Sequence, residues 1–180
     1  MEIPGLGHVA EDPERDGHVS EPIPIKVLGG GLYRVRVHGY VGDPRPEDFS
    51  DAIRNFLDLE PSVLRSAEPY LFAYYDDIRT GTTAPEVEED FPQINTPAEV
   101  WSFLGFIDEV DVERRREGDR GIYISAGGWC DWEDEHGLQV VFKNGLRINK
   151  IGPWDGRLTN GGPTHRPDLE DVIFVGFDQL

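Results

Sequence analysis

The chain has 180 residues, of which 35 are Asp or Glu and 17 are Lys or Arg, so its formal net charge at pH 7 is -18. This charge repels nucleic acid phosphates and anionic lipids, and it attracts basic proteins and cations. No apolar run reaches the roughly 18 residues that span a bilayer, and the first residues lack the basic and apolar regions of a secretory signal. Cys130 is the only cysteine, which excludes an intrachain disulfide and favours a reducing, cytoplasmic location.

The first 21 residues are polar and rich in Gly and Pro. We therefore expect an N-terminal arm over residues 1–21, with one short strand near residues 6–9. Hydrophobic residues make up 38% of the chain, which is enough to form a core. Residues 22–180 are expected to form a single domain.

The segment 22–42 predicts a hairpin, with the glycines at 29–31 in its turn. Apolar and basic side chains alternate over 33–38, which is typical of a strand with one buried and one solvated face. The buried face would carry Tyr33, Val35 and Val37, and the solvated face would carry Arg34, Arg36 and His38.

Helical spacing follows in two segments. A first helix is predicted from Pro46 to the residues before Pro61, and a second from Pro61 to Gly81, with Pro69 kinking it. A third, short helix is predicted after Thr96, because the order Thr96, Pro97 and Glu99 matches a capping box.

Period-two patterns return from residue 108. They predict a hairpin over 109–128, a second hairpin over 136–152 that turns at Asn144-Gly145, and a last strand over 171–177. The basic run 114–116 is interpreted as a solvated strand edge. The fold class is thus α+β, an antiparallel sheet of about six to seven strands with two to three helices packed on one face.

The stretch "GGWCDWEDEHGLQ", residues 127–139, holds the densest set of reactive side chains. Cys130 and His136 are candidate metal ligands, but a closed zinc site needs about four ligands and the remaining histidines are distant in sequence. Phosphate binding is not indicated, because the glycines at 29–31 lead into a strand and not into a helix. No cofactor is implied.

Catalysis by the same stretch is a second hypothesis. Cys130 and His136 could form a thiolate pair, although the four nearby acids would raise the thiol pKa and keep it protonated. A metal-assisted or carboxylate-based hydrolase would use Glu133, Glu135 and His136. These residue types favour a binding role over an enzyme.

Two blocks resemble a family of uncharacterised bacterial domains of unknown function. The first, a C-x-W-E-x-E-H-G-L block, is carried by Cys130, Trp132, Glu133, Glu135, His136, Gly137 and Leu138. The second, a D-G-[HR]-L-T block, is carried by Asp155, Gly156, Leu158 and Thr159, with Arg157 where the family often has histidine. The resemblance spans most of residues 20–160 and implies no established activity.

The leading hypothesis is a protein-binding module with a basic protein partner, and without nucleic acid or membrane contacts. The acidity and layout are similar to those of immunity proteins that inhibit basic toxins, an analogy of layout alone. A third hypothesis makes the block purely structural: Trp132 and Leu138 enter the core, while Glu133, Glu135 and His136 satisfy backbone groups around a bend and pair with arginines such as Arg147 or Arg157. The oligomeric state is not indicated. The expected docking surface consists of Trp129, Asp131, Trp132, Asp134, Trp154 and Asp155.

Overall fold

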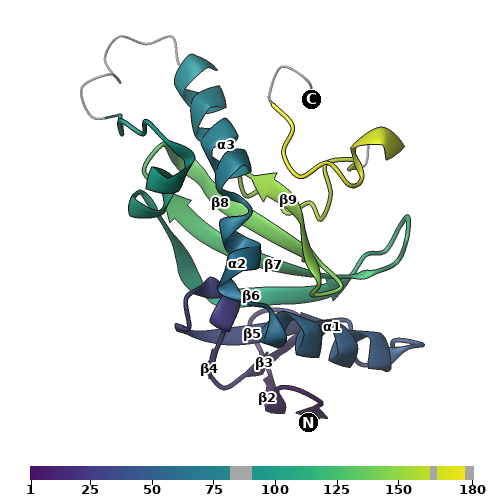
Figure 1. The fold of residues 1–180 in the computed structure, drawn as a ribbon. Helices are drawn as coiled ribbons and strands as arrows, with labels where there is room; N and C mark the ends of the chain where they lie inside the picture. Colours follow the sequence, from purple (N-terminus) through teal and green to yellow (C-terminus); the bar gives the residue numbers. More distant parts are fainter. Residues whose placement is uncertain (82–90, 163–165, 177–180) are drawn as a thin grey trace.

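The computed structural model describes residues 1–81, 91–162 and 166–176. Within these ranges the chain forms three α-helices and one nine-stranded sheet (Figure 1). The helices are α1 (Pro46–Asp58), α2 (Pro61–Arg65) and α3 (Glu68–Gly81), with short 3-10 helices η1 (Lys26–Leu28), η3 (Pro97–Ser102) and η4 (Pro167–Leu169). The strands are β1 (Glu2–Ile3), β2 (Gly7–Glu11), β3 (His18–Ser20), β4 (Ile23–Pro24), β5 (Leu32–His38), β6 (Leu104–Arg114), β7 (Ile122–Cys130), β8 (Glu133–Lys143) and β9 (Arg147–Gly152).

The sheet has the order β1-β2-β3-β5-β6-β7-β8-β9, and β4 also pairs with β5. The described strands pair antiparallel except for β5 and β6, which are parallel. The helices α1 to α3 lie between these two strands in the chain, and such a crossover is what a parallel pair requires. The α+β class is therefore confirmed, but the sheet has more strands than the six to seven expected, and it is not purely antiparallel.

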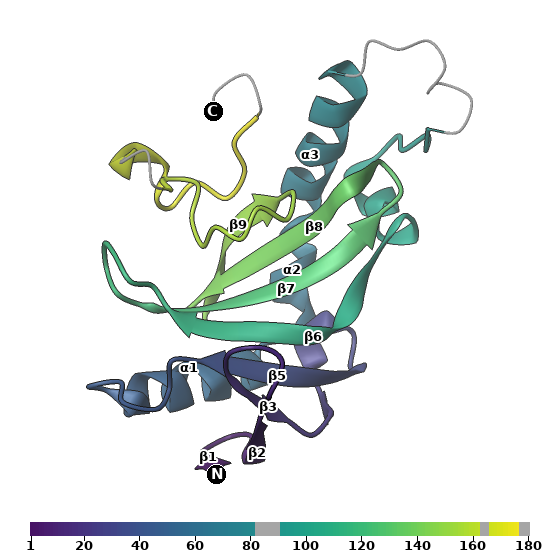
Figure 2. The same ribbon diagram turned by 180° about the vertical axis from the view of Figure 1, so that it is seen from behind.

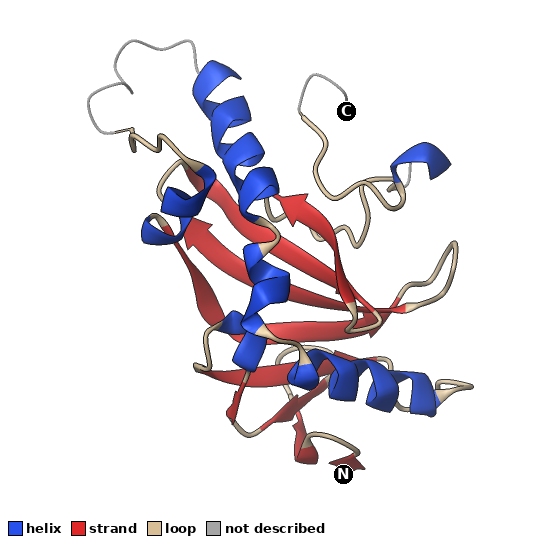
Figure 3. Ribbon diagram, viewed as in Figure 1, coloured by secondary structure: helices blue, strands red, loops and turns tan. Residues whose placement is uncertain are grey.

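The three helices lie in front of the sheet in the view of Figure 3, and the opposite view shows the other face of the strands (Figure 2). The helix α1 packs against β6 and β7, and α3 packs against β9 and η3. Side chains such as Val35, Val110, Ile124 and Val140, at most 2% exposed, form the core between the two layers. Packing on one face holds only in part, because α3 projects beyond the ends of the strands (Figure 1).

Residues 1–21 contribute to the sheet and to its core. They form β1, β2 and β3, and β3 pairs with β5. Ile3 and Val9 are 1% and 0% exposed. The short strand expected near residues 6–9 corresponds to β2, and this N-terminal segment is an integral edge of the sheet.

Prolines and glycines set the remaining boundaries as their backbone preferences predict. Pro46 begins α1, and Pro69 lies in the first turn of α3 after the break at 66–67, so the expected kink is a helix boundary. Asn144 and Gly145 have φ of 53° and 65°, the left-handed pair that a tight hairpin turn needs. The hairpins β4–β5, β6–β7 and β8–β9 are confirmed.

One local prediction holds in part and another is wrong. A short helix does follow Thr96, which is its N-cap residue, but it is the 3-10 helix η3. The expected capping box does not form, because Thr96 makes no side-chain cap bond and the Glu99 carboxylate accepts a hydrogen bond from the Asn95 N–H at 2.8 Å. Residues 171–176 form no strand; their contact with the sheet edge includes the Ile151 N–H to Ile173 O bond, 2.7 Å. Residue 177 lies outside the described residues. No helix in the described ranges is long and apolar enough to cross a membrane.

Candidate functional site

The stretch 127–139 forms the connection between β7 and β8. Cys130 pairs with Glu133, and Asp131 and Trp132 form the turn between them. Trp132 is 3% exposed, and its ring meets those of Tyr74 and Tyr75 on α3 edge to face, each at 6.0 Å between centroids. Trp132 therefore anchors this turn to α3, and its assignment to a docking surface is wrong.

Cys130 is buried at the end of β7. Its Sγ lies 3.9 Å from the backbone oxygen of Glu133. Burial, with a further contribution from the Glu133 carboxylate, raises the pKa of the thiol to about 12. The sulfur is therefore protonated at neutral pH, and the geometry gives it the character of a packed core residue.

The Glu133 carboxylate shapes the turn. Its Oε1 accepts hydrogen bonds from the N–H groups of Glu135, at 2.8 Å, and His136, at 3.1 Å. The His136 ring is 56% exposed, with Nδ1 3.6 Å from the same oxygen. In the described part of the chain, no group of three or more His, Cys, Asp or Glu side chains could hold a metal ion, and Cys130 and His136 form no such group.

The exposed face of the sheet carries two tryptophans of the predicted surface. Ala126 and Cys130 belong to the core under the helices, so the alternation of β7 directs Gly127 and Trp129 to the opposite face. Trp129 is 52% exposed, and its indole lies against Gly105, where an added methyl group would come within 2.7 Å of Nε1.

Trp154 reaches the same face from the segment after β9. Its ring lies against Gly127, where a methyl group would come within 2.6 Å of Cζ3 and 3.2 Å of Ile107 Cδ1. Trp154 is 37% and Ile107 50% exposed. We call Ile107, Trp129 and Trp154 the tryptophan patch. Two bare glycine backbones thus position its indoles while leaving much of their surface open to solvent.

Exposed carboxylates lie close to the tryptophan patch along the chain. They are Asp108, Asp131, Asp134, Glu135 and Asp155. The backbone N–H of Trp154 donates a hydrogen bond to the backbone oxygen of His136 at 3.1 Å. This bond brings Trp154 to the start of β8, where Asp134 and Glu135 lie. Exposed basic side chains of these segments are fewer, because Arg157 is the only Lys or Arg that accompanies these acids.

Lys150 contacts the second sequence block, residues 155–159, through hydrogen bonds. It lies on β9, is 2% exposed, and donates through Nζ to Gln139 Oε1 at 3.0 Å, to Arg157 O at 3.2 Å and to Asp155 Oδ1. The same Asp155 oxygen accepts the Arg157 N–H at 2.8 Å. Burial lowers the pKa of Lys150, and Asp155 opposes this shift. Much of the Asp155 charge therefore compensates a buried ammonium, so this residue contributes less to the docking surface than expected.

The model of a family described as a domain of unknown function (DUF6985) matches residues 5–158. The chain belongs to this family. Its matched region contains the 130–138 block and most of the second block. No curated protein matches the chain, and no solved structure does.

The DUF6985 chain also buries a charged cluster that the sequence pattern missed. Arg36, expected on a solvated face, is 3% exposed. Its guanidinium donates to Glu109 from Nε at 3.1 Å and from Nη2 at 3.0 Å. Its Nη1 lies 2.8 Å from Asp12 Oδ2, an ion pair without hydrogen-bond alignment. His38 Nε2 lies 2.7 Å from Asp111 Oδ1. This cluster joins the parallel strands β5 and β6 to the loop after β2.

The basic run 114–116 is likewise not a solvated edge, because β6 lies inside the sheet. Arg114 donates to both oxygens of Asp43, at 2.7 and 3.0 Å. Arg115 donates to Glu170 at 2.8 Å. These arginines connect the hairpin loop to the segments before α1 and after η4, and they leave Arg116 exposed.

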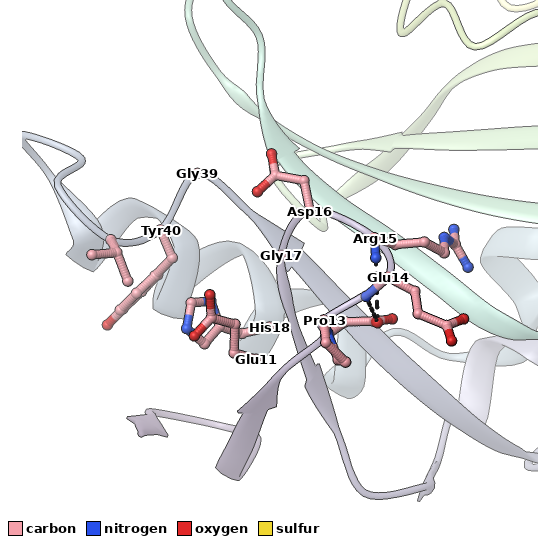
Figure 4. Close-up of a pocket in the computed structure, with 11 residues that line it drawn as sticks. Glu11, Pro13, Glu14, Arg15, Asp16, Gly17, His18, Gly39 and Tyr40 are labelled. Atoms are coloured by element: carbon pink, nitrogen blue, oxygen red, sulfur yellow. Dashed lines mark hydrogen bonds between the residues drawn. The ribbon is translucent and has the colours of Figure 1, made fainter.

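A pocket of about 330 Å³ in the DUF6985 chain lies between the loop 12–17 and the residues after β5 (Figure 4). In this view the side chain of Asp16 points up, whereas those of Glu14 and Arg15 both extend to the right. The Asp12 carboxylate already has hydrogen-bond partners, since its Oδ1 accepts hydrogen bonds from the backbone N–H groups of Glu14 and Arg15. The Asp12 carboxylate therefore stabilises the loop itself.

Proposed function

We propose that this domain is a protein-binding module that docks a basic partner on the tryptophan patch. The observation that carries the proposal is the pair of exposed indoles, Trp129 and Trp154, each held against a glycine of the sheet. Exposed aromatic side chains whose positions are fixed lose little conformational freedom on binding, and tryptophan is enriched among the residues that contribute most to interfaces.

The charge of the chain supports a basic partner. A net charge of -18 accelerates encounter with a positive surface and opposes contact with nucleic acid or anionic lipid. It also opposes pairing of two copies of the chain through this face. An immunity-type inhibitor is the special case in which the basic partner is a toxin.

A hydrolase at residues 130–136 has weaker support. The Cys130 thiol is buried with its pKa raised to about 12. The Glu133 carboxylate is engaged by two backbone N–H groups of its own turn. The pockets at the loop 12–17, beside Arg157, beside α1 and beside Arg114 are not lined by Glu133, Glu135 or His136.

Affinity capture from the native host tests the proposal. The tagged full chain should retain a protein with a basic surface at low and moderate salt, and Trp129→Ala or Trp154→Ala should release it. Tyr70→Ala is the matched control, because Tyr70 is 38% exposed but lies on α3, in the helix layer. Capture that survives both tryptophan substitutions, or that Tyr70→Ala abolishes equally, would contradict docking at this patch.

A further inference from the structure

We infer that the tryptophan patch recognises arginine side chains of its partner, an inference that rests on the proposed docking function. The patch combines two features that a guanidinium can satisfy together. One is the open surface of Trp129 and Trp154. The other is the set of exposed carboxylates that follows Trp129 in the chain, at Asp131, Asp134 and Glu135.

The indoles present an aromatic surface that rests on the sheet. Trp129 lies against Gly105 and Trp154 against Gly127, so closely that a methyl group added at either glycine would require the indole to shift. A cation is attracted to the face of an aromatic ring, most strongly to that of tryptophan. The surface left open on these rings can therefore accept a cationic side chain without rearrangement of the sheet.

The carboxylates select among cations. A guanidinium is planar, so it can stack on an indole while its edge donates paired hydrogen bonds to a carboxylate. An ammonium is a compact and strongly hydrated charge that cannot make both contacts in this way. Asp131 is exposed two residues after Trp129, at the turn where β7 ends, and it is therefore the acceptor that we expect an arginine stacked on Trp129 to use.

The surroundings discriminate against other occupants. A phosphate-bearing ligand meets the acids beside the patch and the charge of the whole chain. A neutral oligosaccharide is the remaining chemistry that stacks on exposed tryptophan, but it would leave the excess of carboxylates without cationic partners. The acids thus favour arginine over a sugar.

Calorimetric titration of the full chain with acetylated hexa-arginine amide and with its hexa-lysine equivalent tests this inference. The arginine peptide should bind about three- to fivefold more tightly, because stacking adds to a charge attraction that both peptides share. Trp129→Ala, with its fold verified by thermal unfolding, should remove this preference and leave the weaker charge-driven binding.

Two variants of equal net charge separate local recognition from the global charge. Asp131→Asn should weaken the arginine peptide more than Asp58→Asn, because Asp58 is exposed at the end of α1 in the helix layer. Equal affinities for the two peptides, or equal effects of the two variants, would overturn arginine recognition. The proposed docking function would then still stand on the capture experiment.

The same titration with cellohexaose tests whether the patch binds a neutral oligosaccharide instead of arginine. No heat of binding is expected from this neutral sugar. Binding of cellohexaose that Trp129→Ala abolishes would overturn the inference in favour of a carbohydrate. Failure of docking itself has a different signature, namely that no partner is captured although the arginine peptide binds.

Discussion

Arg36 holds Glu109 through two hydrogen bonds, of 3.1 and 3.0 Å, across the parallel pair β5–β6. The guanidinium also neutralises Asp12, and it lies 4.0 Å from Asp111. A buried cation surrounded by carboxylates is costly to remove, since its partners then remain partly buried without compensation. The position of this arginine thus links the N-terminal strands to the centre of the sheet.

Arg36→Ala should therefore lower the free energy of unfolding by about 3 kcal/mol. Urea denaturation followed by circular dichroism measures this loss. Arg34→Ala is the matched control, because Arg34 is exposed two residues earlier on the same strand, and its change should stay within about 0.5 kcal/mol. Similar effects of the two variants would show that the cluster stabilises nothing.

Stability should also fall as the pH rises above neutrality. Hydrogen bonding to Asp111 raises the pKa of His38 above its ordinary 6.5, with Glu113 adding to the shift and Arg36 opposing it. The folded state thus favours the protonated ring, and this stabilisation is complete below pH 6.5. It is lost as the pH rises through the pKa of the folded state.

Glu113 acts in the same direction. Burial raises the pKa of its carboxyl above 4.5, so folding favours the protonated form, and this contribution declines as the pH rises from about 4.5. Unfolding free energies between pH 6 and pH 8 should decrease in the unaltered chain and decrease less in His38→Gln. His8→Gln, which changes a histidine that is 72% exposed, should retain the full slope. An unchanged slope in His38→Gln would contradict the assignment.

Cys130 should be unreactive in the folded protein. Its burial and its pKa of about 12 predict negligible modification by a thiol-specific disulfide reagent at pH 7.5, and complete modification after unfolding in urea. Absorbance of the released thiolate measures both rates. Rapid modification of the native chain would reopen the case for a catalytic thiol paired with His136.

Gly145 should tolerate no side chain. A methyl group there would come within 2.0 Å of the Ala52 carbonyl oxygen and 2.7 Å of the Phe56 nitrogen, both on α1. Gly156 provides a control, because its φ of 71° is similar but no atom lies within 4 Å of an added methyl. Gly156→Ala should cost about 1–2 kcal/mol from backbone strain alone.

Gly145→Ala should cost at least about 1 kcal/mol more than Gly156→Ala, because α1 must move away from the hairpin. Thermal unfolding of the two variants measures the difference. Equal losses would mean that strain, rather than the close approach of α1, fixes glycine at this position.

Local signals in the sequence predicted the elements but not their neighbours. Asn144-Gly145 and the proline positions act within a few residues, so they identified hairpins and helix starts correctly. The parallel pair β5–β6 depends on contacts between segments about 70 residues apart. The alternation over 33–38 predicted correctly which face of β5 carries Arg36, since Arg36 does face away from the helices. What it could not show is that Glu109 and Asp12 cover this face.

The candidate site was predicted in part for a similar reason. Trp129 and Trp154 lie on a surface, whereas Trp132 enters the core because the register of β7 and β8 shifts between Gly128 and Cys130. A period-two pattern cannot place a side chain beyond such an irregularity. Ile107 and Lys150 were missed, although Lys150 gave a signal as one of three lysines in the chain, next to the apolar Ile151 of β9.

Lys150 should hold Trp154 in place through the segment that follows β9. Lys150→Met preserves most of the side-chain volume but leaves Asp155 without its ammonium partner and frees Arg157 O. Amide hydrogen exchange over residues 153–158 should accelerate, and the tryptophan emission should shift as Trp154 leaves Gly127. Lys26→Met is the control, because that lysine is 55% exposed and pairs with Glu60 far from the patch. Unchanged exchange over 153–158 in Lys150→Met would mean that Lys150 does not hold this segment, and partner docking should then survive the substitution.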